Sequence, residues 1–341
     1  MQEGLALLPI AALLGVSLSA AAQQEAPRLG WRAYGQFTGE HLDSASGLGF
    51  DVERLRFSTE VTRRRLTGGI QVDFGVDNLG ERAPGSIANG ILDIYLNYQL
   101  GDKHLLRAGE FKTPLGMDFN IGADLLDITK RGMEAGLVLQ RDAGVMISAR
   151  NLGAGFGYDV GVFNIAGRSS AAIYLDSQTG EDNAFAARGH FDSGPWHAEW
   201  AYGETTQAGG PGTADYRVAD VALRYQRERL TFKLEWIEGN NVRGETERNE
   251  AVYYVHGAYR IRDNLELVAR HYSGTSRLGG AASDLDNTYL GFSWWAYDNG
   301  RTQGRLQVNY VVAGGDGAAY TGVRGFLDDA LLAQFQFHVS R

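Results

Sequence analysis

The sequence of 341 residues contains no cysteine, which excludes both a disulfide framework and a thiolate metal site. Proline is scarce, with 6 residues, whereas glycine reaches 46. Beyond the N-terminus, no apolar run approaches the roughly 18 residues that a membrane-spanning helix needs. An excess of positive charge is also lacking: the net charge of −9 argues against a nucleic-acid binder, which normally presents a basic face. If this chain crosses a membrane, it does so as a barrel.

The N-terminus has the features of a secretory signal. Leu5 to Ala22 is apolar and ends in the small residues Ala20, Ala21 and Ala22, as an export signal with its cleavage site does. The four residues before it carry no Lys or Arg, so the signal is atypical or the start codon is misplaced. A buried helix is the alternative. We expect residues 1–22 to be a signal peptide and 23–341 to form the folded domain.

From Gly30 onward, the apolar residues recur with a period of two. Leu230, Phe232 and Leu234, for example, alternate with Lys233 and Glu235. This period predicts strands rather than helices, and segments of about ten residues fit tilted membrane strands. The sixteen predicted segments are 31–38, 54–61, 70–76, 91–100, 105–113, 143–150, 156–162, 185–191, 196–202, 219–225, 230–236, 253–261, 265–270, 289–294, 305–312 and 331–339.

The connections between these segments alternate in length. Seven are tight turns, and eight longer ones fall near 41–49, 77–90, 114–141, 166–181, 206–214, 239–248, 276–286 and 313–325. Short periplasmic turns opposite longer external loops are typical of outer-membrane barrels, as are aromatic residues at the strand ends. The pattern predicts an all-β fold, a transmembrane antiparallel β-barrel of about 16 strands. A soluble β-propeller or double sandwich is the rival, because its strands would alternate too.

One connection is much longer than a simple loop. Pro114 ends the predicted strand 105–113, because proline cannot donate to a sheet ladder. About 25 residues follow without a strand pattern before alternation resumes at Ala143. A loop of this length in a tightly turned β chain is usually functional. We expect residues 114–141 to be the third external loop, folded inward into the pore.

Five stretches between residues 50 and 150 resemble the phosphate-selective porin O and P family. They are Glu53-Arg54-Leu55-Arg56-Phe57, Gly68-Gly69-Ile70-Gln71-Val72-Asp73-Phe74, Leu92-Asp93-Ile94-Tyr95-Leu96, Leu106-Arg107-Ala108-Gly109-Glu110-Phe111-Lys112-Thr113-Pro114-Leu115-Gly116 and Arg141-Asp142-Ala143-Gly144-Val145. The G-x-F-K-T-P-x-G pattern is the most specific of them. Beyond residue 150 the likeness is one of architecture.

The resemblance implies a 16-stranded porin in the outer membrane of a Gram-negative bacterium, usually a homotrimer. Its partners would be outer-membrane lipid and lipopolysaccharide, together with small anionic or hydrophilic solutes. It implies passive diffusion of anions, phosphate or polyphosphate among them, with no cofactor and no enzymatic activity. If trimers form, an apolar wall near Trp31, Phe37, Leu55 and Phe57 is the expected contact.

The polar face of the strands supplies the candidate pore residues, because charges that line a constriction set channel selectivity. The basic candidates for pore lining and anion binding are Arg54, Arg56, Lys112, Lys130, Arg131 and Arg150. The opposing lumen acids are Glu60, Asp73, Asp93 and Glu110. Because the two signs nearly balance, these arginines could instead pair with the acids and stiffen the wall. The facing of strand 105–113 stays open, since either face carries a charge, Arg107 or Glu110.

Other chemistry has weak support in the sequence. His190, His197 and His256 lie on the polar faces of different strands without metal-ligand spacing, so we expect no metal site. The function predicted here is passive diffusion through a porin. The alternatives are an outer-membrane barrel enzyme acting on lipid, which needs a serine and a histidine at the lipid edge, and a soluble all-β carbohydrate-binding protein.

Overall fold

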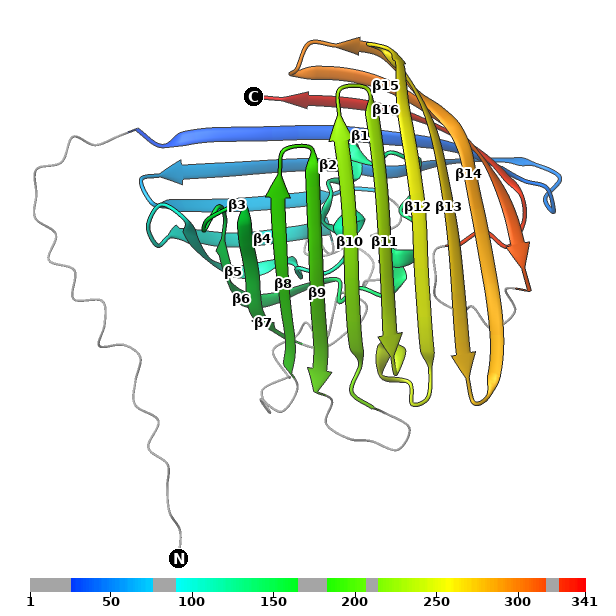
Figure 1. Ribbon diagram of the computed structural model, residues 1–341. Helices are drawn as coiled ribbons and strands as arrows, with labels where there is room; N and C mark the ends of the chain where they lie inside the picture. Colours follow the sequence, from blue (N-terminus) through cyan, green and yellow to red (C-terminus); the bar gives the residue numbers. More distant parts are fainter. Residues whose placement is uncertain (1–25, 76–89, 165–182, 207–213, 317–324) are drawn as a thin grey trace, which may run out of the picture.

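The computed structural model describes residues 26–75, 90–164, 183–206, 214–316 and 325–341. Its sixteen strands form one closed antiparallel barrel in which each strand pairs with its neighbours in sequence and β1 pairs with β16 (Figure 1). The strands are β1 Arg28–Leu42, β2 Leu48–Arg63, β3 Leu66–Asp73, β4 Ile91–Gln99, β5 His104–Lys112, β6 Arg141–Ala149, β7 Phe156–Phe163, β8 Asn183–Ser193, β9 Trp196–Thr206, β10 Arg217–Arg227, β11 Leu230–Asn240, β12 Asn249–Arg262, β13 Leu265–Leu278, β14 Ala281–Asp298, β15 Thr302–Gly315 and β16 Ala330–Ser340. The predicted barrel of about 16 strands is confirmed.

The burial pattern along the strands is the reverse of that in a water-soluble protein. On β11, Leu230 and Leu234 are 46% and 39% exposed, whereas the charged Lys233 and Glu235 are 4% and 1% exposed. The same exposed apolar parity recurs around the barrel. An apolar outer surface over a polar interior is stable only where lipid surrounds the barrel. The rival soluble β fold does not account for this surface.

The short connections define one end of the barrel, here called the turn side, as at residues 64–65 between β2 and β3. The opposite end is the loop side. The connection predicted at 276–286 is not a long loop: β13 runs to Leu278 and β14 begins at Ala281. Gly279 and Gly280, with φ of 55° and 86°, make a tight two-residue turn that favours glycine. Predicted loops 77–90, 166–181, 206–214 and 313–325 lie largely outside the described residues, as does the predicted signal peptide.

Residues 113–140, which join β5 to β6, are here called the inner segment. They contain the short helix α2 Met117–Asn120 and the turns η3 Ala123–Leu125 and η4 Met133–Gly136. A further short turn, η6 Val242–Gly244, joins β11 to β12. No helix in the described ranges has the length and apolarity to span a membrane. Figure 1 shows the helical turns of the inner segment within the ring of strands.

Candidate functional site

The inner segment crosses the barrel and is fixed to the opposite wall by ion pairs. Asp118 accepts from Lys233 of β11 at 2.9 Å and from Arg270 of β13 at 2.5 Å. Asp127 accepts from the same two side chains at 2.5 and 3.2 Å. Burial by itself would raise the pKa of Asp118, but Arg270 and Lys233 hold that pKa well below its usual range. These pairs therefore stay charged at neutral pH.

Backbone amides of the inner segment bind wall carboxylates. The N–H of Gly116 donates to Asp220 of β10 at 3.0 Å. The N–H groups of Met117 and Asp118 donate to Glu235 of β11 at 2.9 and 3.2 Å. These bonds satisfy the amides at the start of α2, which have no partner within a helix.

Wall side chains on β1, β15 and β16 bind carbonyl groups farther along the inner segment. Arg305 donates to the carbonyl oxygens of Asp124 and Leu126, both at 3.1 Å. Further such bonds, between 3.0 and 3.2 Å, come from Gln36, Gln307, Gln334 and Gln336. Six strands (β1, β10, β11, β13, β15 and β16) thus hold the segment across the lumen.

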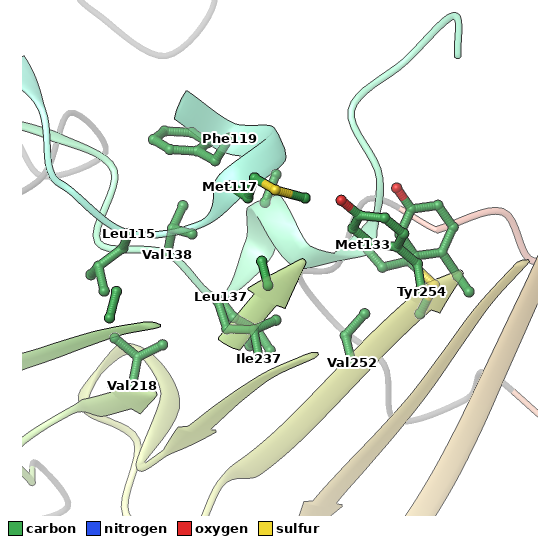
Figure 2. Close-up of a cluster of buried hydrophobic side chains, with 14 of the residues drawn as sticks. Leu115, Met117, Phe119, Met133, Leu137, Val138, Val218, Ile237, Val252 and Tyr254 are labelled. Atoms are coloured by element: carbon green, nitrogen blue, oxygen red, sulfur yellow. The ribbon is translucent and has the colours of Figure 1, made fainter. Parts of the chain in front are cut away.

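An apolar cluster completes the attachment. Leu115, Met133 and Leu137 of the inner segment have no measurable exposure. They belong to one buried cluster with Val218 of β10 and Ile237 of β11 (Figure 2). The interior of the barrel therefore contains a packed core against the loop-side ends of β10–β12, which excludes water from that part of the lumen.

Three cavities in the rest of the interior are lined by residues that the structure describes. A loop-side cavity of about 780 Å³ is lined by Arg54, Lys130 and Arg131. A second cavity of about 840 Å³, here called the turn-side chamber, is lined by residues of β1–β8 and by residues 120–125. A third, of about 980 Å³, lies between the inner segment and β10–β15 on the turn side. The inner segment separates the second from the third, because Asn120, Gly122 and Leu125 line both.

Two cations, Lys112 and Arg131, lie close together between the loop-side cavity and the turn-side chamber. This place is here called the junction. Arg131 donates to the carbonyls of Asp118 at 2.6 Å and Ile121 at 2.7 Å. Lys112 donates to the same Ile121 carbonyl at 3.0 Å and to that of Phe119. Within the described ranges, neither cation forms an ion pair with a carboxylate. Burial lowers the pKa of Arg131 to about 9, and the nearby Arg54 and Arg141 contribute.

The other predicted basic residues are paired. Arg54 contacts Glu53 at 2.6 Å, and Arg56 contacts Asp73 at 2.5 Å. Lys130 pairs with Glu40. Arg150 contacts Asp159 at 2.9 Å on the turn side, away from the junction. The structure thus brings Arg54, Lys112 and Arg131 together with Arg56, but it does not bring Arg150 to them.

The predicted acids divide between the two faces of the wall. Asp73 pairs with Arg56, Asp93 contacts Arg141 at 2.7 Å, and Glu60 lines the turn-side chamber. The prediction that Glu110 faces the lumen is wrong. Glu110 stands in register with Ile94 and Ala143, both of the exposed outer face. Cross-strand neighbours share a face, so Glu110 lies outside.

Three charged residues that sequence reasoning left out belong to the site. Glu53 turns inward because the register shifts between Gln36 and Phe37, which places two consecutive residues of β2 on one face. Arg141 stands opposite Lys112 at the last pair of β5 and β6. Arg107 faces the turn-side chamber. The Arg107 facing was recoverable from parity once Glu110 was placed outside, whereas the bulge leaves no clear signal.

The lumen histidines are not isolated from one another. His190 and His197 contact the same carboxylate, that of Asp192, at 3.4 and 2.7 Å. The ring centroids of the two histidines are 6.1 Å apart. Across the described parts of the chain, no group of three or more metal-ligating side chains has the geometry to hold a metal ion.

Comparison with known proteins identifies the fold. No protein-family model and no curated protein sequence matches the chain. Among solved structures, it is similar to the outer-membrane protein OmpT of Vibrio cholerae in a trimer form, with a TM-score of 0.65 and 12% identity over 93% of this chain and 100% of that one. The anion-selective porin of Comamonas acidovorans gives a TM-score of 0.65 and 12% identity, covering 93% and 99%.

A third similar structure is OmpF of Salmonella typhi in complex with daunomycin, with a TM-score of 0.65 and 12% identity over 92% of this chain and 97% of that one. At such identities the likeness concerns the fold. The fold and the apolar outer surface define a transmembrane β-barrel with the architecture of these outer-membrane proteins. The finer resemblance to phosphate-selective porins stays a prediction.

Proposed function

We propose that this chain is a passive diffusion channel of the outer membrane of a Gram-negative bacterium. The closed barrel with its apolar outer surface supports a membrane location, and the cavities on both sides of the inner segment support a solute path. In this proposal, the inner segment is the third external loop and narrows the lumen. The channel is not an enzyme.

We further propose that the channel prefers anions. One observation carries this proposal: Lys112 and Arg131 share the carbonyl of Ile121, so two cations lie next to each other without an ion-paired carboxylate in the described residues. Carbonyl dipoles compensate such a pair only in part. The net positive potential attracts anions and repels cations at the junction. Phosphate is one candidate solute among small anions.

Reconstitution of the detergent-extracted protein in a planar bilayer tests both proposals. We expect discrete conductance and a reversal potential, across a KCl gradient, of the sign that anion permeation gives. The double variant Lys112→Gln, Arg131→Gln should lose most of that preference, and Arg150→Gln is the matched control. Conductance without selectivity would contradict the proposed anion preference. The absence of discrete conductance would contradict the proposed channel function.

Phosphate itself needs a separate measurement. Addition of inorganic phosphate at constant ionic strength should reduce the chloride current if the junction retains phosphate. The same current with and without phosphate would leave an anion channel with no phosphate specificity. Each result is read against the double variant, in which the junction cations are absent.

The alternative of a lipid-acting enzyme predicts a different result. His271 of β13 is exposed on the outer face, where its hydrogen-bond partner is Thr288 of β14 at 2.9 Å, and Ser273 lies two residues farther on the same face. A serine hydrolase would need His271 to activate Ser273. We expect Ser273→Ala to leave conductance unchanged and the wild type to release no fatty acid from phospholipid.

We also propose a homotrimer that contacts outer-membrane lipid and lipopolysaccharide. Phe37, Leu55 and Phe57 are 48%, 46% and 42% exposed on the outer faces of β1 and β2. The side chains of Phe37 and Leu55 pack over Gly35, 3.3 and 3.6 Å from a Cβ placed there, so they form one continuous apolar surface. Light scattering of the detergent complex should give three copies, and a monomer would contradict the assembly.

A further inference from the structure

One tyrosine has a cation over its ring and an anion at its hydroxyl, and both charged groups line the turn-side chamber. Nε of Arg107 donates to Asn97 at 2.8 Å, and its guanidinium carbon lies 4.4 Å from the ring centre of Tyr95. The hydroxyl of Tyr95 donates to Glu60. All but Asn97 line the turn-side chamber. Arg107 and Glu60 are thus held by neutral groups rather than by each other.

The strand register places Glu60 and Tyr95 on either side of a glycine of β3. Glu60 of β2 stands opposite Gly69 of β3, and Gly69 stands opposite Tyr95 of β4. A Cβ at position 69 would come within 2.4 Å of Tyr95 Cζ. Glycine there therefore allows the Tyr95 ring to cross β3 and reach Glu60. No other residue type leaves that path clear.

Arg107 differs from the neighbouring arginines of the chamber because the partner of its Nε is neutral. Arg56 and Arg141 are each paired with a carboxylate through Nε, whereas the partner of Arg107 is an amide. Its guanidinium carbon lies over the Tyr95 ring and 5.3 Å from the centre of the Phe111 ring. With Nε engaged, the edge formed by the two Nη atoms is the one that a carboxylate would meet with two parallel hydrogen bonds.

We propose that Arg107, Tyr95 and Glu60 form a binding site for zwitterionic solutes of the amino-acid type. The carboxylate binds the Nη edge of Arg107, the ammonium binds Glu60, and the body of the solute lies along the Tyr95 ring. A solute with both charges satisfies both protein groups at once, whereas a simple anion leaves Glu60 as a repulsive neighbour. The inference rests on the proposed channel function, because the chamber must be reached by solute.

The experiment compares three small probes with one skeleton: alanine, which carries both charges at neutral pH, N-acetylalanine, which keeps the carboxylate, and alaninamide, which keeps the ammonium. Binding is measured by concentration-dependent reduction of the KCl current and, independently of conductance, by saturation-transfer NMR on the detergent-solubilised protein. We expect alanine to bind roughly tenfold more tightly than either analogue, the size of one charge-assisted contact.

Two variants assign the two ends of the solute. Glu60→Gln should weaken alanine binding to the level of N-acetylalanine, and Arg107→Gln should weaken it to the level of alaninamide. Asp102→Asn is the matched control, because Asp102 is an exposed acid that lines the same chamber. The melting temperature by circular dichroism verifies that each variant is folded.

Equal binding of alanine and N-acetylalanine to the wild type would overturn the site, as would Glu60→Gln without effect on alanine. If the protein conducts anions and gives either result, the binding site is disproved, whereas the proposed channel function is unaffected. Alanine binding by NMR in a protein that forms no channel would do the opposite: the site would stand and the channel proposal would fall.

Discussion

Two walls of the same barrel use charged side chains for different purposes. On β10–β16, here called the sealed wall, Lys233 and Arg270 are buried in ion pairs with the inner segment. On β2–β6, here called the open wall, Arg56, Arg107 and Arg141 are held on their own wall and face the turn-side chamber. The strands on both walls have the same alternation of apolar and polar residues.

The difference lies in the partner of each charge. A wall cation whose partner is a carboxylate of the inner segment fixes that segment and is removed from solvent. A wall cation held at Nε by its own wall keeps a hydrogen-bonding edge toward the lumen. Whether a wall cation faces the lumen therefore depends on which wall the inner segment covers, and charge content alone does not distinguish the two walls.

The largest effect should come from breaking the sealed wall. Arg270→Gln leaves Asp118 with Lys233 and Asp127 with Lys233 and the more distant His256, at 3.8 Å, in a buried site. Breaking a buried pair in this way costs about 3–5 kcal/mol, and we expect a loss of that order in urea unfolding of the reconstituted protein. The matched control is Arg260→Gln, because Arg260 is half-exposed and lies 3.5 Å from Glu266.

The control should cost less than about 1 kcal/mol, as exposed pairs do. Channel recordings sharpen the comparison further. If the sealed wall holds the inner segment, Arg270→Gln should raise the current noise and the mean conductance, since the segment gains freedom to leave the lumen. Equal stability of the two variants would contradict the distinction between the walls.

The strand order could be predicted from the sequence because a membrane barrel imposes alternation on every strand. Leu230 to Trp236 shows why: lipid selects one face and the lumen the other. The length of the stretch after Pro114 indicates only a long loop, and its inward path is expected once that loop belongs to a transmembrane barrel. Its anchors, such as Asp220 and Glu235, could not be predicted, because they depend on which distant strands the segment meets.

Local irregularities account for the remaining errors. The extra residue at Glu53 changes the facing of β2 without a change in composition. Gly279 and Gly280 close a hairpin in a stretch whose Ser, Gly and Asp content is typical of a long loop. The facing of Arg107 stays open in the sequence because alternation has two phases, and a single misplaced phase exchanges the two faces of a strand.

A smaller effect is expected from filling the space at Gly69 on the open wall. Gly69→Val would place side-chain atoms in the volume of Tyr95, because a Cβ at position 69 would already lie 2.4 Å from Tyr95 Cζ. Overpacking of this kind costs about 1–3 kcal/mol. The pairing of Tyr95 with Glu60 should be lost as well. Gly68→Val is the control, because a Cβ at 68 meets nothing within 4 Å.

Both variants are compared by urea unfolding and by alanine binding. Gly69→Val should lose stability and bind alanine no better than N-acetylalanine, whereas Gly68→Val should resemble the wild type. If Gly69→Val retains the preference for alanine, the position of Tyr95 over β3 does not matter for the chamber.

The pH dependence of selectivity examines the junction. The pKa of Arg131 is lowered to about 9, first by burial and then by Arg54 and Arg141. The group is charged below that pKa and neutral above it, so the anion preference should be constant near neutral pH and fall as the pH rises through about 9. Lys112 shares the Ile121 carbonyl with Arg131, so the step is measured in the Lys112→Gln variant, where this neighbouring cation is absent. Arg131→Gln should remove the step, and a step of the same size in that variant would assign it elsewhere.

The smallest effect on selectivity should come from substitution of Glu110. This substitution tests which residues of β5 face the lumen. Because Glu110 shares the outer face with Ile94 and Ala143, Glu110→Gln should leave the reversal potential unchanged. Asp93→Asn removes the carboxylate that holds Arg141 at 2.7 Å, so it should increase the anion preference. Both substitutions delete one negative charge within neighbouring strands. A similar shift from both would place Glu110 in the lumen, whereas a shift from Asp93→Asn alone separates the open wall from the lipid-facing surface.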